Sequence, residues 1–163
     1  LPEAQLDRFL LHLNIDYPDA DAELAILRLT RGEALEGDKA NIEPISQADL
    51  FSARQQVLGL HLAEPLEQYL VQLIVATRDG QRIDDDLANW IEYGASPRAT
   101  IALDKAARAQ AWLSGRDFVS PEDIQSVFHN VLRHRIILSY EAQAEGVTKD
   151  QVLTRILERV AVP

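Results

Sequence analysis

Residues 94–115 read GASPRATIALDKAARAQAWLSG, and this stretch decides the fold class. Ser96 and Pro97 suit a helix N-cap and a first helical residue, and Gly115 suits a C-cap, so one helix is expected between them. Small apolar residues repeat along it at helical spacing, which permits close packing against other helices. The expected buried stripe consists of Ala99, Ala102, Leu103, Ala106, Ala109 and Leu113.

Helical periodicity and capping residues predict further helices on both sides of this stretch. Ser120 followed by Pro121 and two acids is a strong helix start, and Thr148 to Gln151 form a capping box. The fold class is therefore expected to be mainly α. The other helices are expected at residues 2–7, from 19, at 46–60, 65–78, from 120 and at 148–160, with residues 31–44 as a loop.

Two weaker patterns predict β-strands. Leu11, Leu13 and Ile15 alternate with polar residues, which is the period of a strand, but no partner strand lies nearby in the sequence. Residues 10–16 are therefore expected to be an orphan strand whose sheet lies upstream. Residues 118–119 and 135–138 are two further short candidates, and a parallel pairing between them would make a tiny two-stranded sheet.

Composition excludes several classes of function. The formal net charge of −10 argues against an extended nucleic-acid surface, because such surfaces neutralise phosphates with Lys and Arg. The absence of cysteine excludes disulfides, thiolate metal sites and a cysteine nucleophile, and the four histidines are too dispersed to predict a metal site. No signal peptide, initiator methionine or membrane-length apolar run is present, so we expect a cytoplasmic piece of a larger protein.

Arg98 is the sharpest candidate for a binding residue. It falls in the first turn of the helix that Ser96 and Pro97 begin, where free backbone N–H groups and the helix dipole already favour anions. A phosphate docked there would meet amides and guanidinium together. The alternative is a surface ion pair with Glu92 or with the acidic residues 84–86, which themselves suit an exposed helix start better than a cation site.

Arg8 is the second candidate, because it closes a short helix just before the apolar residues 10–16. A rigid base at such a position can project a guanidinium outward. The alternative is a local contact with Glu3 or Asp7.

These local patterns meet a family resemblance that covers essentially the whole chain. Residues 1–9, LPEAQLDRF, resemble the segment that ends the nucleotide-binding core of MoxR-type AAA+ ATPases, and residues 94–99, GASPRA, resemble the sensor 2 motif of that family. Residues 69–71, 76–78, 115–123 and 134–135 support the resemblance in the correct order. The resemblance implies that residues 1–60 end the AAA+ core and that residues 61–163 form the C-terminal helical lid.

The resemblance also implies a mechanism for the full-length protein, in which ATP with Mg²⁺ is bound between the subunits of a ring. Arg8 would be the arginine finger that acts in trans on a neighbour's ATP, although Arg78 or Arg116 could also face a subunit boundary. Arg98 would be sensor 2, which with Ser96 and Pro97 contacts the phosphates on its own core. The residues present would be inactive alone and hold no cofactor.

Partners follow from the same resemblance. MoxR-type proteins are chaperone-like, and a partner with a von Willebrand factor A domain is implied. The competing hypothesis is a non-enzymatic helical module whose acidic surface binds a basic protein. A helix-turn-helix DNA binder is disfavoured by the charge.

Overall fold

The computed structural model describes residues 2–36 and 43–163. Contacts between Cα atoms divide the chain into two compact units, one of Leu1–His12 with Ser52–Pro163 and one of Leu13–Phe51. The expected boundary at residue 60 separates a core from a lid by function, so this boundary stays a prediction.

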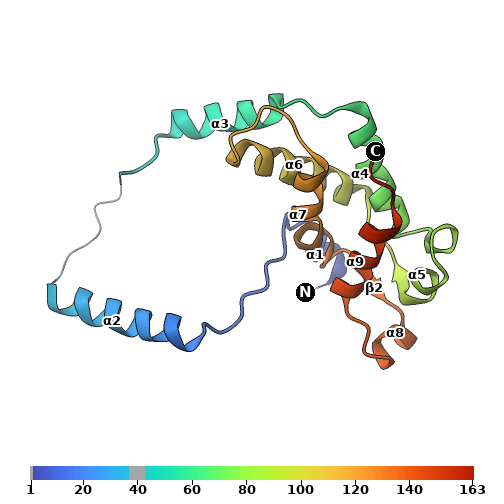
Figure 1. Ribbon diagram of the computed structural model, residues 1–163, viewed down its shortest axis with the longest axis horizontal. Coiled ribbons are helices and arrows are strands. Elements are labelled where there is room, and N and C mark those ends of the chain that lie inside the picture. The colour runs from blue at the N-terminus through green and yellow to red at the C-terminus, as the bar shows by residue number, and fades with distance from the viewer. Residues whose placement is uncertain (1, 37–42) are drawn as a thin grey trace. The chain divides into compact units, whose positions relative to one another are not determined.

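The larger unit holds most of the helices and the two strands (Figure 1). Its elements are α1 (Glu3–Leu6), α4 (Glu64–Ala76), the 3₁₀ helix η1 (Gly80–Arg82), α5 (Asp85–Trp90), β1 (Ile91–Tyr93), α6 (Pro97–Leu113), α7 (Pro121–Leu132), β2 (Ile137–Leu138), α8 (Tyr140–Ala144) and α9 (Lys149–Arg159). The helix α3 (Gln47–Gly59) begins in the smaller unit and ends in the larger one.

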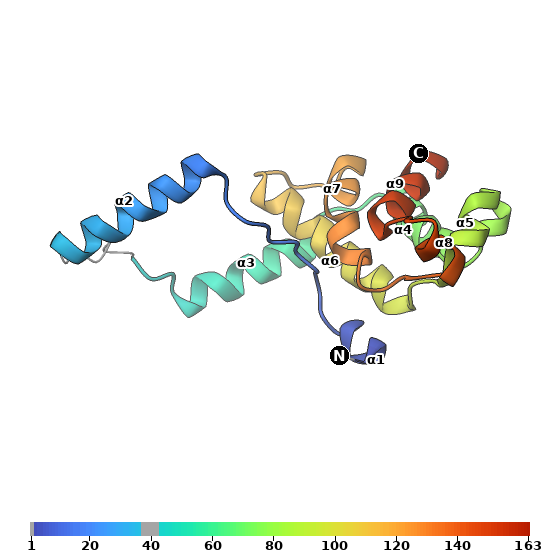
Figure 2. The same ribbon diagram turned by 90° about the horizontal axis from the view of Figure 1, so that it is seen from below.

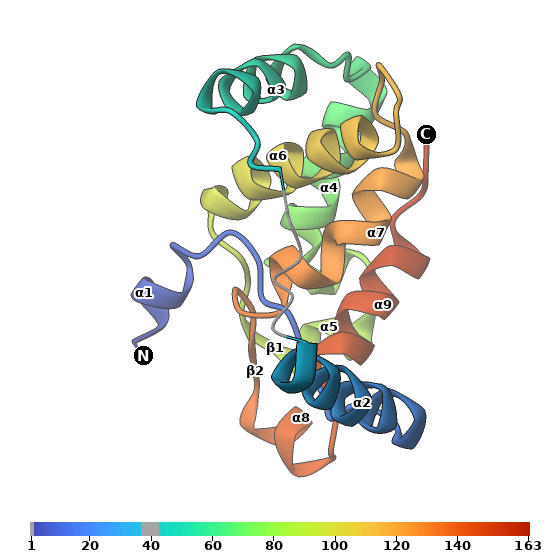
Figure 3. The same cartoon turned by 90° about the vertical axis from the view of Figure 1, so that its left-hand side faces the viewer.

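The core of the larger unit lies between α4, α6, α7 and α9. The helix α6 packs on α4 and α7, and α7 packs on α9 (Figure 3). Figure 2 shows α4, α5, α8 and α9 grouped at one end of this unit. Leu73, Leu103 and Phe128 are fully buried, and burying such side chains stabilises the fold by about 1.5–3 kcal/mol each.

The helix α6 buries a stripe close to the expected one. Ala99, Ala102, Leu103 and Ala106 are buried as predicted, but the last turns bury Ala107 and Ala111. Leu113 is 75% exposed, so its predicted burial is wrong. The reason is that the last turns of α6 meet a different neighbour, the segment 56–60, which Arg108 and Trp112 contact.

The strand pairing differs from the predicted one. The strands β1 and β2 pair antiparallel, with Ile91 opposite Leu138. Phe118 instead forms an isolated parallel bridge with His61. A tiny two-stranded sheet is therefore confirmed, but the parallel pairing of residues 118–119 with 135–138 is wrong, because local sequence does not encode which strand becomes the neighbour.

Residues 10–16 form no strand in the described chain. No ladder pairs them, and Leu13 and Ile15 are 61% and 93% exposed. A strand exists only when a partner satisfies its N–H and C=O groups, and none of the described residues supplies that partner.

The smaller unit contains α2 (Ala20–Glu36) and the first turns of α3. The predicted loop at 31–44 is wrong as far as Glu36, because α2 continues through Gly32, and residues 37–42 lie outside the described residues. An interior glycine weakens a helix without necessarily ending it. The apolar side chains of α2, including Ile26 and Leu29, are exposed.

Candidate functional site

The turn before α6 is held tightly against the end of α4. The hydroxyl of Thr77 accepts a hydrogen bond from the N–H of Ala95 at 2.9 Å, and Nε of Arg78 donates to the carbonyl of Ala95 at 2.5 Å. A Cβ atom on Gly94 would lie 2.2 Å from the carbonyl oxygen of Thr77. Glycine at position 94 is therefore required by the close approach of two backbones, and it fixes where α6 begins.

Ser96 caps α6 as predicted. Its Oγ accepts a hydrogen bond from the N–H of Arg98 at 3.2 Å, and Pro97 occupies the first helical position. The N–H of Ala99 donates to the carbonyl of Ser96 at 2.9 Å. The amides of residues 98 and 99 are therefore already engaged. An anion at this end of α6 would meet the guanidinium and the helix dipole, not the free amides expected from the sequence.

Arg98 and Arg8 both present exposed side chains. Arg8 follows α1, where its N–H donates to the carbonyl of Gln5 at 3.1 Å. Within residues 2–36 and 43–163, no ion pair or side-chain hydrogen bond involves either guanidinium. The local ion pairs that the sequence offered as alternatives are therefore not seen among the described residues.

The acidic residues 84–86 have other partners. The side chain of Asp84 accepts from the N–H of Asp86 at 3.0 Å and caps α5. Asp84 also lies 2.9 Å from Arg155 and 2.7 Å from Arg159 on α9. Desolvation acts to raise the pKa of Asp84, but the Asp86 amide and the two guanidiniums outweigh it and lower that pKa. This triplet is therefore a helix start that anchors α5 to α9.

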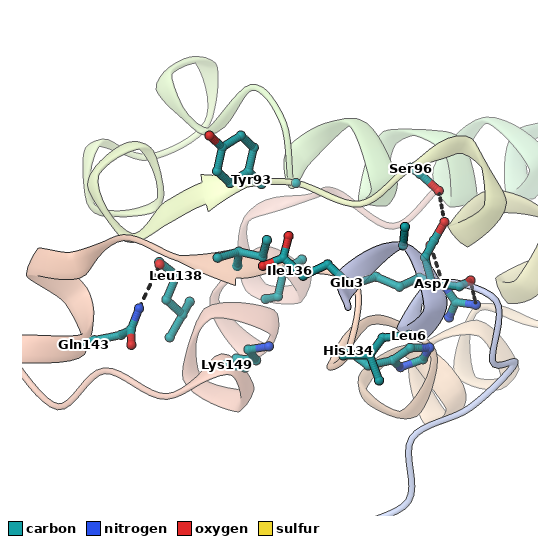
Figure 4. A pocket seen from close by; sticks show the side chains of 14 residues that line it. Glu3, Leu6, Asp7, Tyr93, Ser96, His134, Ile136, Leu138, Gln143 and Lys149 are labelled. Atoms are coloured by element: carbon teal, nitrogen blue, oxygen red, sulfur yellow. Dashed lines mark hydrogen bonds and ion pairs between the residues drawn. The ribbon is translucent and has the colours of Figure 1, made fainter. Parts of the chain in front are cut away.

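Asp7 connects the segment of Arg8 to the start of α6. The hydroxyl of Ser96 donates to Oδ2 of Asp7 at 2.9 Å, and Nε of Arg135 lies 3.2 Å from Oδ1 of the same carboxylate (Figure 4). Arg8 is the residue after Asp7, and Arg98 is two residues after Ser96. One hydrogen bond thus brings the two predicted arginine positions together, although 89 residues separate its partners in the chain.

Arg135 is buried at this junction. Its side chain is 2% exposed, and that of Asp7 is 22% exposed. Burial lowers the pKa of the Arg135 guanidinium, while the Asp7 carboxylate acts to raise it. An arginine remains protonated under such conditions, so the buried charge depends on Asp7 and on carbonyl oxygens for compensation.

His134 lies beside Arg135 and faces the same segment. Its Nε2 is 3.0 Å from the carbonyl oxygen of Phe9, which makes Nε2 the donor, and its buried Nδ1 has no partner among the described residues. Burial is the main cause that lowers the pKa of His134. The ring is therefore held in its neutral form.

A cavity of about 560 Å³ lies between α1, β1 and β2. Leu6, Tyr93 and Ile136 contribute to its lining, which is mainly apolar, and Lys149 is its exposed-side cation (Figure 4). Burial lowers the pKa of Lys149, while Glu3 acts to raise it. Neither Arg8 nor Arg98 lines this cavity.

The other two candidates for the finger have partners. Arg116 contacts the buried carboxylate of Asp123 and donates to Ser120 at 3.1 Å, and Arg78 donates to the turn before α6. Both guanidiniums therefore act in holding the lid together. Sequence reasoning missed Asp7 and Arg135 as a pair, and the signal for Arg135 was a lone charge followed by the apolar run 136–138.

No described helix is long and apolar enough to cross a membrane. Residues 86–156 match the family model described as the AAA lid domain. The class defined by the fold and the turn before α6 is therefore that of AAA lid domains.

Relatives match the whole chain. It is 35% identical to the "Chaperone MoxR1" of Mycobacterium tuberculosis over 100% of this chain and 42% of that protein. It is also 35% identical to the "Protein MoxR" of Methylorubrum extorquens over 100% of this chain and 50% of that protein. A crystal structure of a Cytophaga hutchinsonii protein proposed to be an ATPase shares 37% identity and a TM-score of 0.93, covering 100% of this chain and 49% of that one.

The chain belongs to the MoxR-type AAA+ ATPases. It spans about half the length of the curated relatives it matches. The activity and partners of the whole protein are accordingly proposals.

Proposed function

We propose that this chain supplies two arginines to ATP hydrolysis by a full-length MoxR-type ATPase that acts as a ring. ATP with Mg²⁺ would be bound by a phosphate-binding loop outside these residues, and no hydrolysis is expected from the chain alone. The observation that carries the proposal is the Asp7–Ser96 hydrogen bond, because it brings together two arginines whose guanidiniums are exposed and without ion pairs in the described residues.

The proposed role of Arg8 is that of an arginine finger acting in trans. A guanidinium stabilises the negative charge on the transferring phosphoryl group, and in other NTPases such a residue raises kcat by about 10³- to 10⁵-fold. The engagement of Arg78 and Arg116 by carbonyl and carboxylate groups supports Arg8 as the finger.

The proposed role of Arg98 is that of the sensor 2 cation, which contacts ATP phosphates. A cation in the first turn of a helix is unfavourable by about 0.3–1 kcal/mol, and a bound anion removes this penalty. Ser96 and Pro97 support the site by fixing the start of α6. The family resemblance implies that Arg98 acts on its own subunit's ATP, whereas its closeness to the Arg8 segment favours one nucleotide for both arginines.

The experiment that tests both roles is steady-state ATP hydrolysis by the full-length protein with Arg8→Ala or Arg98→Ala. We expect Arg8→Ala to lower kcat by at least about 100-fold, since transition-state stabilisation is lost. Arg98→Ala should lower kcat and weaken ATP binding. Normal hydrolysis by both variants, with ring assembly intact, would show that the proposed roles are wrong.

A mixed-ring arm decides whose nucleotide Arg98 contacts. Arg98→Ala subunits are mixed with subunits that are disabled in their phosphate-binding loop. Activity should return if Arg98 acts in trans, because the disabled subunit then supplies it to an intact loop. No recovery would show that Arg98 acts on its own subunit.

The wider role proposed is chaperone-like maturation of partner proteins in the cytoplasm, with a von Willebrand factor A domain protein as the partner to test. Sequencing upstream distinguishes this role from that of a non-enzymatic module. The proposal requires a glycine-rich phosphate loop and an acidic strand within roughly 200 residues, which is the usual size of a domain.

A further inference from the structure

Three consecutive residues after α7 hold the backbone on both sides of Arg8. Arg133 donates to the carbonyl oxygen of His12 at 2.9 Å, and His134 donates to that of Phe9 at 3.0 Å. The N–H of His12 also donates to the carbonyl oxygen of Asn130 at 2.7 Å. The end of α7 therefore fixes residues 7–12 through main-chain groups.

Arg135 makes the largest share of these contacts. Its Nε pairs with the carboxylate of Asp7, and its terminal nitrogens donate to the carbonyl oxygens of Asp7 at 3.3 Å, Phe9 at 2.5 Å and Leu10 at 3.2 Å. A further hydrogen bond to the carbonyl oxygen of Val131 ties the guanidinium to its own helix. The planar fork of arginine can satisfy several acceptors at fixed angles, which an ammonium cannot do.

These contacts bracket one residue. Asp7 and Phe9 are the two neighbours of Arg8, and Arg135 holds the carbonyl group of each. The side chain of Arg8 itself is exposed, so nothing among the described residues restrains its guanidinium except the backbone from which it projects. The direction in which Arg8 reaches is therefore set by Arg135.

We propose that Arg135 is the positioning residue for Arg8 in ATP hydrolysis. This inference rests on the proposed function of Arg8 as a trans finger. Arg135 does not touch the nucleotide. It keeps the Arg8 peptide at the height and angle from which the guanidinium meets the neighbouring subunit's phosphoryl group, and Asp7 extends the same support to Ser96 at the start of α6.

The test is kcat and KM for ATP of the full-length protein with Arg135→Met. A displacement of about 1 Å at a catalytic group can lower the rate by about 100-fold, so we expect kcat to fall about 10- to 100-fold with KM for ATP nearly unchanged. The double variant Arg8→Ala/Arg135→Met should be no slower than Arg8→Ala alone, because both changes remove one contribution.

Arg108→Met is the matched control. Arg108 is a similarly shielded arginine, 16% exposed, that pairs with Asp104 and donates to the carbonyl oxygen of Leu60. It contacts no residue of the segment 1–12 in the described chain. Any general effect of removing a shielded guanidinium from the lid should appear in this variant, whereas the loss of kcat should not.

Mixed rings separate positioning from a defect in the variant's own ATP site. Arg135→Met subunits mixed with subunits disabled in their phosphate-binding loop should regain activity, because the disabled subunit presents a correctly held Arg8. Absence of recovery in assembled rings would overturn the proposal. Arg135→Lys, which keeps the charge beside Asp7 but not the fork, should show a smaller kcat loss and covers the case in which the Met variant does not fold.

The outcomes also distinguish this inference from the proposed function. If Arg8→Ala lowers kcat and both Arg135 variants do not, the positioning role is wrong and the finger role stands. If Arg8→Ala hydrolyses ATP normally, the finger role itself is wrong.

Discussion

Gly94 fixes how closely the start of α6 approaches the end of α4. A methyl group there would meet backbone atoms of Thr77, which cannot move aside without disturbing the hydrogen bonds that hold Ala95. The position of Arg98, four residues later, depends on this approach.

Replacing Gly94 by alanine should therefore destabilise the chain. Overpacking of this kind lowers the free energy of unfolding by about 1–3 kcal/mol. Gly59→Ala is the control, because a Cβ atom at Gly59 has nothing within 4 Å and alanine favours the helical conformation. Urea unfolding of the two variants should give opposite shifts, and an unchanged midpoint for Gly94→Ala would contradict the close approach.

His134 should make stability depend on pH. Its pKa is lowered in the folded state, chiefly by burial and also by Arg135 and His12, while the Phe9 carbonyl and Asp7 act to raise it. Because the unfolded state then binds a proton that the folded state refuses, stability should fall as the pH drops below the ordinary value of 6.5 and level off below the folded pKa.

The measurement is urea unfolding between pH 8 and pH 5 for the wild type and His134→Gln. Glutamine can still donate to the Phe9 carbonyl but does not titrate, so it should remove this part of the pH dependence. Parallel stability curves for the two proteins would contradict the neutral state of His134.

At the residue scale, sequence reasoning succeeded where the signal was local. Ser96, Pro97 and the first-turn position of Arg98 follow from adjacent residues, and the structure confirms the cap. The pairing of Asp7 with Arg135 spans 128 residues, and no local pattern encodes it. For the same reason the sequence pointed to Asp7 only as a neighbour of Arg8.

The N-caps of α6 and α9 differ in one respect that can be tested. Ser96 and Thr148 each accept a backbone N–H in the first turn of their helices. Only Ser96 also donates to Asp7. A loss that affects the cap alone can therefore be compared with a loss that also affects the Arg8 segment.

Ser96→Ala and Thr148→Ala should each lower the free energy of unfolding by about 1 kcal/mol, the usual contribution of an N-cap. Only Ser96→Ala should also lower kcat for ATP in the full-length protein, by roughly tenfold, because the Arg8 segment loses one of its supports. Thermal unfolding and ATP hydrolysis of both variants check this. Equal activities would show that the Asp7–Ser96 bond has no role beyond stability.

At the element scale, capped helices were the most predictable features. The helices α4, α6, α7 and α9 lie where caps and periodicity place them, because both signals are contained within a few turns. The strands were less predictable, since β1 and β2 are short and depend on a partner far along the chain. The expected strand at residues 10–16 lacks any partner in the described residues.

For the whole molecule, the chain is about half as long as its MoxR-type relatives, and many of its apolar side chains are exposed. Leu13, Ile15 and the apolar residues of α2 are examples. The account assigns ATP binding to residues outside this chain and assigns Arg8 and Arg98 to the phosphates of that ATP. The direction of Arg8 across a subunit boundary is the claim on which the rest depends.

Mixed rings of Arg8→Ala subunits and subunits disabled in their phosphate-binding loop test this claim most directly. Each protein alone should be inactive. After random mixing in equal amounts, about a quarter of the interfaces in a cyclic ring should combine an intact loop with a neighbour's Arg8, and a similar fraction of wild-type ATP hydrolysis should return. If rings assemble and the mixture stays inactive, Arg8 does not act in trans.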